Sequence, residues 1–141
     1  MIQELMIINK AGLALFYHNF KKEDRNADEQ SLAGYFDIIC RFTKRNFKES
    51  LRLITLDSVT FFFFTHKSRY HLVLKCDNYK FDKNELEILS EMIIDEFVEK
   101  YSDILKDFNG DISLFKSFST NIDDLLISNA DDFKNLLIID N

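Results

Sequence analysis

Residues 2–20 read IQELMIINKAGLALFYHNF, and this stretch decides the fold. It contains two short apolar segments, residues 4–9 and 13–20, whose composition is typical of β-strands. Lys10, Ala11 and Gly12 lie between them, and a short connection that contains glycine favours a hairpin. The sequence therefore predicts a chain that opens as a β-hairpin with no helix before it, an order that excludes many small α/β folds.

The next segment has the periodicity of a helix. Asn26 or Asp28 can cap its first turn, and apolar residues then recur at helical spacing up to residue 47. The opposite face is basic, and several of its cations lie in the last turns, where they complement the helix dipole. The apolar positions are Leu32, Tyr35, Phe36, Ile39, Cys40 and Phe47.

Three further strands are predicted at residues 51–56, 59–66 and 70–76. The middle one contains four consecutive phenylalanines, residues 61–64. Successive side chains of a strand point to opposite faces, so both faces of this strand are apolar and both must be covered. That requires helices on both sides of the sheet. The short connections at residues 57–58 and 67–69 predict an antiparallel meander.

The second half of the chain is helical. A long helix begins at Asp82 or Asn84, and we expect Asn109 and Gly110 to end it as a left-handed cap. A further helix is expected at residues 112–118, and two apolar segments follow at 122–127 and 130–139. The sequence therefore predicts an α/β (α+β) fold in three layers. A five-stranded antiparallel sheet, with elements in the order ββαβββαα, has one helix on one face and the long helix plus a short helix on the other.

This order of elements resembles the longin fold. Residues 7–12 (IINKAG), followed by residues 15–17 (LFY), are similar to the opening hairpin of the small longin-type subunits of the transport-protein-particle (TRAPP) tethering complex and of adaptor-complex small chains. The resemblance covers residues 1–120, and residues 121–141 are interpreted as a C-terminal helical extension of the same domain. It implies a non-enzymatic adaptor or scaffold of membrane traffic or small-GTPase regulation. The implied partners are another longin-type or roadblock-type subunit, a second copy of the chain, and a small GTPase.

Charge is distributed unevenly. The net charge of −6 divides into +4 for residues 1–80 and −10 for residues 81–141. One interpretation is two solvated faces, and the other is a bipolar molecule with a basic docking face for an acidic partner or an anionic membrane. The candidate interaction surface consists of Arg41, Lys44, Arg45, Lys48 and Arg52.

No motif for chemistry stands out. The three glycines form no phosphate-binding loop, and the phenylalanine run lacks the basic neighbours of a nucleic-acid platform, so we expect no cofactor and no nucleic acid. His66 and His71 can approach each other across a hairpin, but no third metal ligand has matching spacing. Cys40 and Cys76 are scattered, which indicates buried thiols in a reducing compartment. With no signal peptide or membrane-spanning segment in the sequence, we expect a cytoplasmic protein.

Two alternatives to the adaptor remain open at this point. The first is a small-ligand-binding sensor domain with a cavity under the sheet, which would need a roomy pocket with a few convergent polar groups. The second is an enzyme whose catalytic groups come together only in space. No base–nucleophile or carboxylate pair is visible in the sequence, so the prediction is that the chain is not an enzyme.

Overall fold

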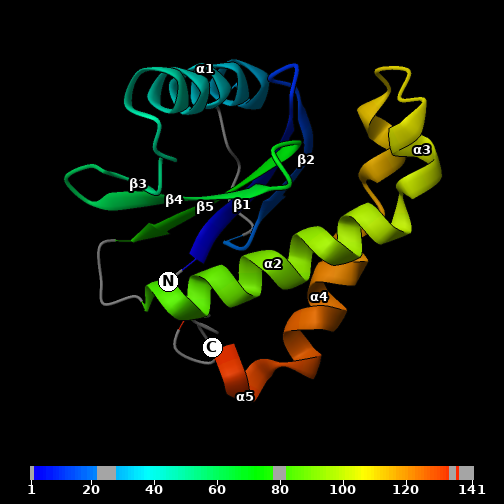
Figure 1. The fold of residues 1–141 in the computed structure, drawn as a ribbon. Helices are drawn as coiled ribbons and strands as arrows, with labels where there is room; N and C mark the ends of the chain where they lie inside the picture. The colour runs from blue at the N-terminus through cyan, green and yellow to red at the C-terminus, as the bar shows by residue number, and fades with distance from the viewer. Residues whose placement is uncertain (1, 22–27, 78–81, 134–135, 137–141) are drawn as a thin grey trace.

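The computed structural model describes residues 2–21, 28–77, 82–133 and 136. Five strands, five α-helices and one 3-10 turn are found in this part of the chain (Figure 1). Their bounds are β1 Ile2–Asn9, β2 Ala14–Asn19, α1 Glu29–Phe47, β3 Leu53–Thr55, β4 Val59–His66, β5 Tyr70–Asp77, α2 Lys83–Lys100, α3 Ser102–Lys106, η1 Ile112–Phe115, α4 Phe118–Ser128 and α5 Ala130–Phe133.

The strands form one antiparallel sheet in the order β2-β1-β5-β4-β3. Two units built from neighbouring strands, β1–β2 and β3–β4–β5, are joined by the pairing of β1 with β5, in which Asn9 lies opposite Tyr70. The predicted hairpin and meander are therefore both confirmed. This order also puts the β1–β2 turn and the β4–β5 turn at the same end of the sheet, and it leaves β2 and β3 as the edges.

Helices cover both faces of the sheet. Figure 1 shows α1 on one face and α2, α4 and α5 on the other. Phe62 is 3% exposed and packs in the core on the α2 side, whereas Phe63 is 1% exposed and packs in the core on the α1 side. Neighbouring positions of one strand thus bury their rings in opposite layers, and the predicted three-layer arrangement is confirmed.

The β1–β2 turn requires its glycine. The Asn9 side-chain oxygen accepts hydrogen bonds from the backbone N–H groups of Ala11 and Leu13, both at 3.0 Å. Gly12 has a φ of +77°, a conformation that L side chains rarely adopt. A Cβ at this position would also lie 3.3 Å from Asp37 Oδ2 on α1. A larger residue would therefore be strained in its backbone, and the Asp37 side chain would have to shift to make room for it.

The first turn of α1 is fastened in two ways. Of the two cap residues that the sequence allows, Asn26 and Asp28, Asp28 caps the helix by accepting from the backbone N–H groups of Gln30 and Ser31. Gln30 then pairs with the edge strand β2: its amide nitrogen donates to the Ala14 carbonyl at 2.9 Å, and its amide oxygen accepts from the Ala14 N–H at 2.8 Å. The side chain therefore occupies the place that a further strand would take beside Ala14.

The prediction of one long helix up to Asn109 and Gly110 is wrong. Helix α2 ends at Lys100 with Tyr101 as its cap, and the short helix α3 follows and ends at Lys106. The side chain of Tyr101 is buried, and its hydroxyl is 2.9 Å from Ser117 Oγ, so the chain turns where it meets the later segments. Gly110 does have a φ of +93°, but it lies in the loop that precedes η1.

The helix expected at residues 112–118 is a 3-10 turn instead, and α4 begins at Phe118. The predicted segment 122–127 lies within α4. Of the segment predicted at 130–139, α5 covers Ala130–Phe133, and residues 134–135 and 137–139 lie outside the described residues. Buried Ile122, Leu125, Phe133 and Leu136 belong to the same core as α2. The proposed division at residues 120 and 121 falls inside α4 and stays a prediction.

Candidate interaction surface

Helix α1 presents an unexpected apolar stripe to solvent. Tyr35, Ile38 and Phe42 are 55%, 61% and 57% exposed. They recur at spacings of three and four residues, which puts them on one face of the helix. The side that meets the sheet is formed by other residues of the same helix, among them Phe36 and Cys40.

The sequence-based grouping of α1 is wrong for two residues. It includes Tyr35 among the apolar positions that face the core, and also Phe47, which is 64% exposed. The apolar arc of α1 is wider than the strip that the sheet covers, so its margins remain in water. The grouping omits Ile38 and Phe42, although their spacing from Tyr35 is a second helical pattern that the sequence contains.

The five predicted basic residues differ in their position on and beyond α1, and their role as one interaction surface stays a prediction. Arg41 and Lys44 follow Asp37 at intervals of four and three residues, so they share one side of α1. Lys48 ends the helix as its left-handed cap, and its Nζ donates to the Arg45 carbonyl at 3.0 Å. Arg45 follows Phe42 by three residues and continues the outward apolar stripe instead. Arg52 lies beyond the helix, just before β3, where its carbonyl accepts a hydrogen bond from Phe63 N at 2.9 Å.

Arg41 and Lys44 line an open groove of about 590 Å³. The groove lies between α1 and the β1–β2 and β4–β5 turns, which supply Lys10 and Lys67. Sequence reasoning missed these two lysines, because only the pairing of β1 with β5 brings their turns together. Arg45, Lys48 and Arg52 are outside the groove. Its full lining is Lys10, Asp37, Cys40, Arg41, Lys44, Ser50, Leu51, Thr65, Lys67, Ser68 and His71.

A buried carboxylate anchors this side of the groove. The Asp37 side chain is 2% exposed, and its Oδ2 atom is 2.8 Å from Arg41 Nη2. Its Oδ1 atom is 3.7 Å from Nε2 of His71, whose Nδ1 is 3.0 Å from Thr65 Oγ1. Burial lowers the pKa of His71 below the ordinary imidazole value, although Asp37 opposes this shift, and Arg41 lowers it further. His71 is therefore neutral at pH 7, and Arg41 carries the charge that balances Asp37.

Neither cysteine is an activated nucleophile. Burial raises the pKa of Cys40 to about 11, and nearby Asp37 adds to this shift. Burial also raises the pKa of Cys76 to about 11. Because the thiolate is the reactive form, both side chains behave as small buried apolar groups at neutral pH.

The two histidines of the β4–β5 hairpin lie apart. His66 Nδ1 is 3.6 Å from Asp95 on α2, whereas His71 approaches Asp37 on α1, so the rings are on opposite faces of the sheet. The approach that the sequence allowed does not occur. Among the described residues, no group of three His, Cys, Asp or Glu side chains is arranged to hold a metal ion. None of the helices in these ranges is long and apolar enough to cross a membrane.

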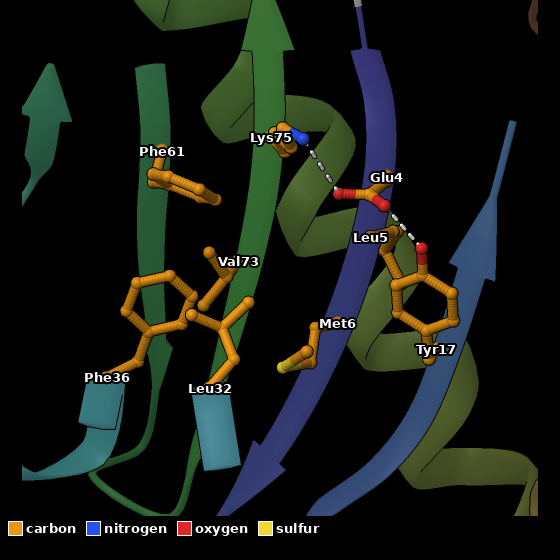
Figure 2. Close-up of a pocket in the computed structure, with 9 residues that line it drawn as sticks. All are labelled: Glu4, Leu5, Met6, Tyr17, Leu32, Phe36, Phe61, Val73 and Lys75. Atoms are coloured by element: carbon orange, nitrogen blue, oxygen red, sulfur yellow. Dashed lines mark hydrogen bonds and ion pairs between the residues drawn. The ribbon is translucent and has the colours of Figure 1, made fainter. Parts of the chain in front are cut away.

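The cavity between α1 and the sheet is almost filled. Figure 2 shows its lining, where Glu4 lies between Tyr17, whose hydroxyl donates to it, and Lys75, whose Nζ is 3.4 Å away. Leu32 and Phe36 reach in from α1. The cavity measures about 10 Å³, which is the room of one water molecule at most. A sensor domain with its ligand at this position would need a far larger space.

The arrangement of the sheet and its helices defines a longin-like fold. Myxococcus xanthus MglB shares it, with a TM-score of 0.51 and 15% sequence identity over 76% of this chain and 85% of that one. The gliding protein MglB of Thermus thermophilus aligns with a TM-score of 0.47 and 13% identity, over 54% of this chain and 61% of its own. No family model matches the sequence, and comparison with curated proteins finds no similar sequence.

Proposed function

We propose that this chain is a non-enzymatic, longin-like adaptor or scaffold subunit that works by pairing. Its partner is a second copy of itself or another longin-type or roadblock-type chain. The observation that carries the proposal is the outward stripe of α1, Tyr35, Ile38 and Phe42. Large apolar side chains that lie together on an exposed helix face mark protein–protein contact sites more often than single exposed ones.

The adjoining sheet edge supports the same surface. Of the two edges, β2 is occupied at Ala14 by the Gln30 side chain, and no described strand pairs with the outer side of β3. Helix α1 leads directly into β3 through residues 48–52. An unpaired edge offers backbone donors and acceptors to another chain. A partner chain that packs on the apolar stripe of α1 and pairs a strand with β3 would therefore cover both the stripe and the unpaired edge.

Basic residues border this surface and would orient an acidic partner on it. Arg45 continues the apolar stripe, Arg41 and Lys44 lie on the adjacent side of α1, and Lys48 caps the end of the helix. Arg52 precedes the β3 edge. Cations at the margin of an interface speed the approach of an acidic partner and orient it more than they raise affinity. The acidic helix α2 of a second chain is one such partner, and a small GTPase or an anionic membrane is another.

The resemblance to longin-type tethering subunits and adaptor small chains supplies the setting of the proposal. From that resemblance we infer a role in membrane traffic or small-GTPase regulation, in the cytoplasm. The unpaired, buried Cys40 and Cys76 support a reducing compartment. The raised thiol pKa values support a role without nucleophilic chemistry.

Light scattering over a concentration series tests the pairing. We expect the unmodified chain to dimerise and the Ile38→Glu, Phe42→Glu double variant to remain monomeric, because burying one such side chain is worth about 1.5–3 kcal/mol. The matched control is the Leu114→Glu, Ile127→Glu double variant. Those residues are 42% and 75% exposed on η1 and α4, so the control carries equal new charge away from both α1 and α2.

A monomer at every concentration would contradict self-pairing. Capture from native lysate with the same three proteins then tests pairing with a different chain. A partner that binds the unmodified chain and the control but not the α1 variant supports the proposal. Equal capture by all three would contradict the assignment of this surface.

A further inference from the structure

The groove beside α1 concentrates positive charge in an acidic protein. Lys10, Arg41, Lys44 and Lys67 line it, and Asp37 is the one carboxylate among its described lining residues. Asp37 is already paired with Arg41 at 2.8 Å. The three lysines come from three separate segments and surround a hollow instead of following a line. The net charge of the whole chain is −6, so this excess of cations is local.

The rest of the lining indicates which anion fits. Ser50, Thr65 and Ser68 add hydroxyl groups, and only Cys40 and Leu51 are apolar. A nucleotide base or an acyl chain would need an apolar slot, which these two side chains do not form. The volume of about 590 Å³ lies within the range of small-molecule sites, roughly 300–1,000 Å³. A compact, highly charged ligand without an aromatic part matches this composition.

We propose that the groove binds a compact polyphosphate, either a soluble inositol or sugar phosphate or the phosphorylated headgroup of a lipid. The lysine ammonium groups act as point charges toward separate phosphates. Arg41 is held in place by Asp37 and keeps further N–H donors for a phosphate oxygen, because a guanidinium carries five. The site goes beyond the proposed pairing: it lies on a different side of α1 from the apolar stripe, so either can fail alone.

Calorimetric titration with inositol trisphosphate, and separately with inorganic phosphate, tests the site. We expect the trisphosphate to bind more tightly, since several phosphates meet several cations, and its affinity to fall as salt is raised. The Lys10→Glu, Lys67→Glu double variant should bind about tenfold more weakly or worse. The Lys83→Glu, Lys116→Glu double variant is the matched control. It makes the same change in net charge at exposed positions outside the groove and should bind as the unmodified chain does.

A sedimentation assay with phosphatidylcholine vesicles separates the two sources of phosphate. Binding only when the vesicles contain phosphatidylinositol bisphosphate supports the proposal with a lipid headgroup as ligand. Binding of the soluble trisphosphate without vesicle binding supports it with a soluble ligand. If the unmodified chain binds neither probe, the proposal is overturned, and the cations serve an acidic protein partner instead. Equal weakening in the groove variant and the control also overturns it.

Discussion

Replacing Phe63 by alanine tests the three-layer core most directly. The ring is 1% exposed and meets the ring of Phe36 edge-on, with 5.2 Å between the centroids. Losing a buried phenylalanine costs its transfer free energy plus the cost of the cavity, about 3–5 kcal/mol. The free energy of unfolding of a domain of this kind is about 5–15 kcal/mol, so we expect the variant to lose a large part of its stability. Phe62→Ala should cost a similar amount in the opposite layer, whereas Phe61→Ala, at a half-buried position, should cost about 1–2 kcal/mol.

Urea unfolding followed by far-ultraviolet circular dichroism measures these differences, since the chain has no tryptophan to report by fluorescence. A double-mutant cycle gives the sharper test. Phe36 and Phe63 should be coupled by about 0.5–1.5 kcal/mol, the usual value for an aromatic pair. Phe36 and Phe62 lie in different layers and should be close to additive. Equal coupling in both cycles would refute the two-sided burial of β4. So would a smaller loss of stability for Phe63→Ala than for Phe61→Ala.

Two further predictions concern His71 and the glycines. Because the pKa of His71 is lowered in the folded state, its contribution to stability is present in full above the unfolded-state pKa of about 6.5 and is lost as the pH falls below it. His71→Gln should flatten this part of a curve of unfolding free energy against pH, and an unchanged slope would exclude His71 as the cause. Gly12→Ala should destabilise by about 1–2 kcal/mol in urea, because of its positive φ and the contact with Asp37. Gly34 lies inside α1, and no atom is within 4 Å of a Cβ added there, so Gly34→Ala should stabilise the protein by about 0.5–1 kcal/mol. A change of the same sign in the free energy of unfolding for both variants would contradict the packing described.

The layers could be predicted from the sequence because they depend on local periodicity. A strand with apolar side chains at every position has to be covered twice, whatever its neighbours are, and Phe62 and Phe63 meet that requirement. The break at Tyr101 could not be predicted in this way. Helical spacing of apolar residues continues past it through Ile104, Leu105 and Phe108, and the turn of the chain depends on contacts with Ser117 and Phe115.

Only some of the cations that line the groove could be found from the sequence, for the same reason. Arg41, Lys44 and Arg45 are neighbours in the sequence, but the helix turns them toward different surroundings. Lys10 and Lys67 are far apart in the sequence and line the same groove only because β1 pairs with β5. A groove assembled from three segments has no signature in the local sequence. The outward stripe of α1 does have one, but helical spacing alone does not show how wide a strip of the helix the sheet covers, so the stripe was not recognised as exposed.

The strand order also has a consequence for synthesis on the ribosome. Strand β1 is an inner strand of the sheet, between β2 and β5, yet β5 is made almost seventy residues later. At about 5–20 residues per second, that interval lasts roughly 3–14 s. For most of this interval, once β2 has also been made, the nascent chain carries a hairpin whose inner edge and apolar side chains, such as Leu5 and Ile7, lack their partners from β5 and α2. The unpaired hairpin can therefore bind wrong partners or chaperones for longer than it could in a protein whose sheet pairs only strands that are neighbours in the sequence. A change in the translation rate of residues 20–70 should alter the yield of folded protein more than its final stability.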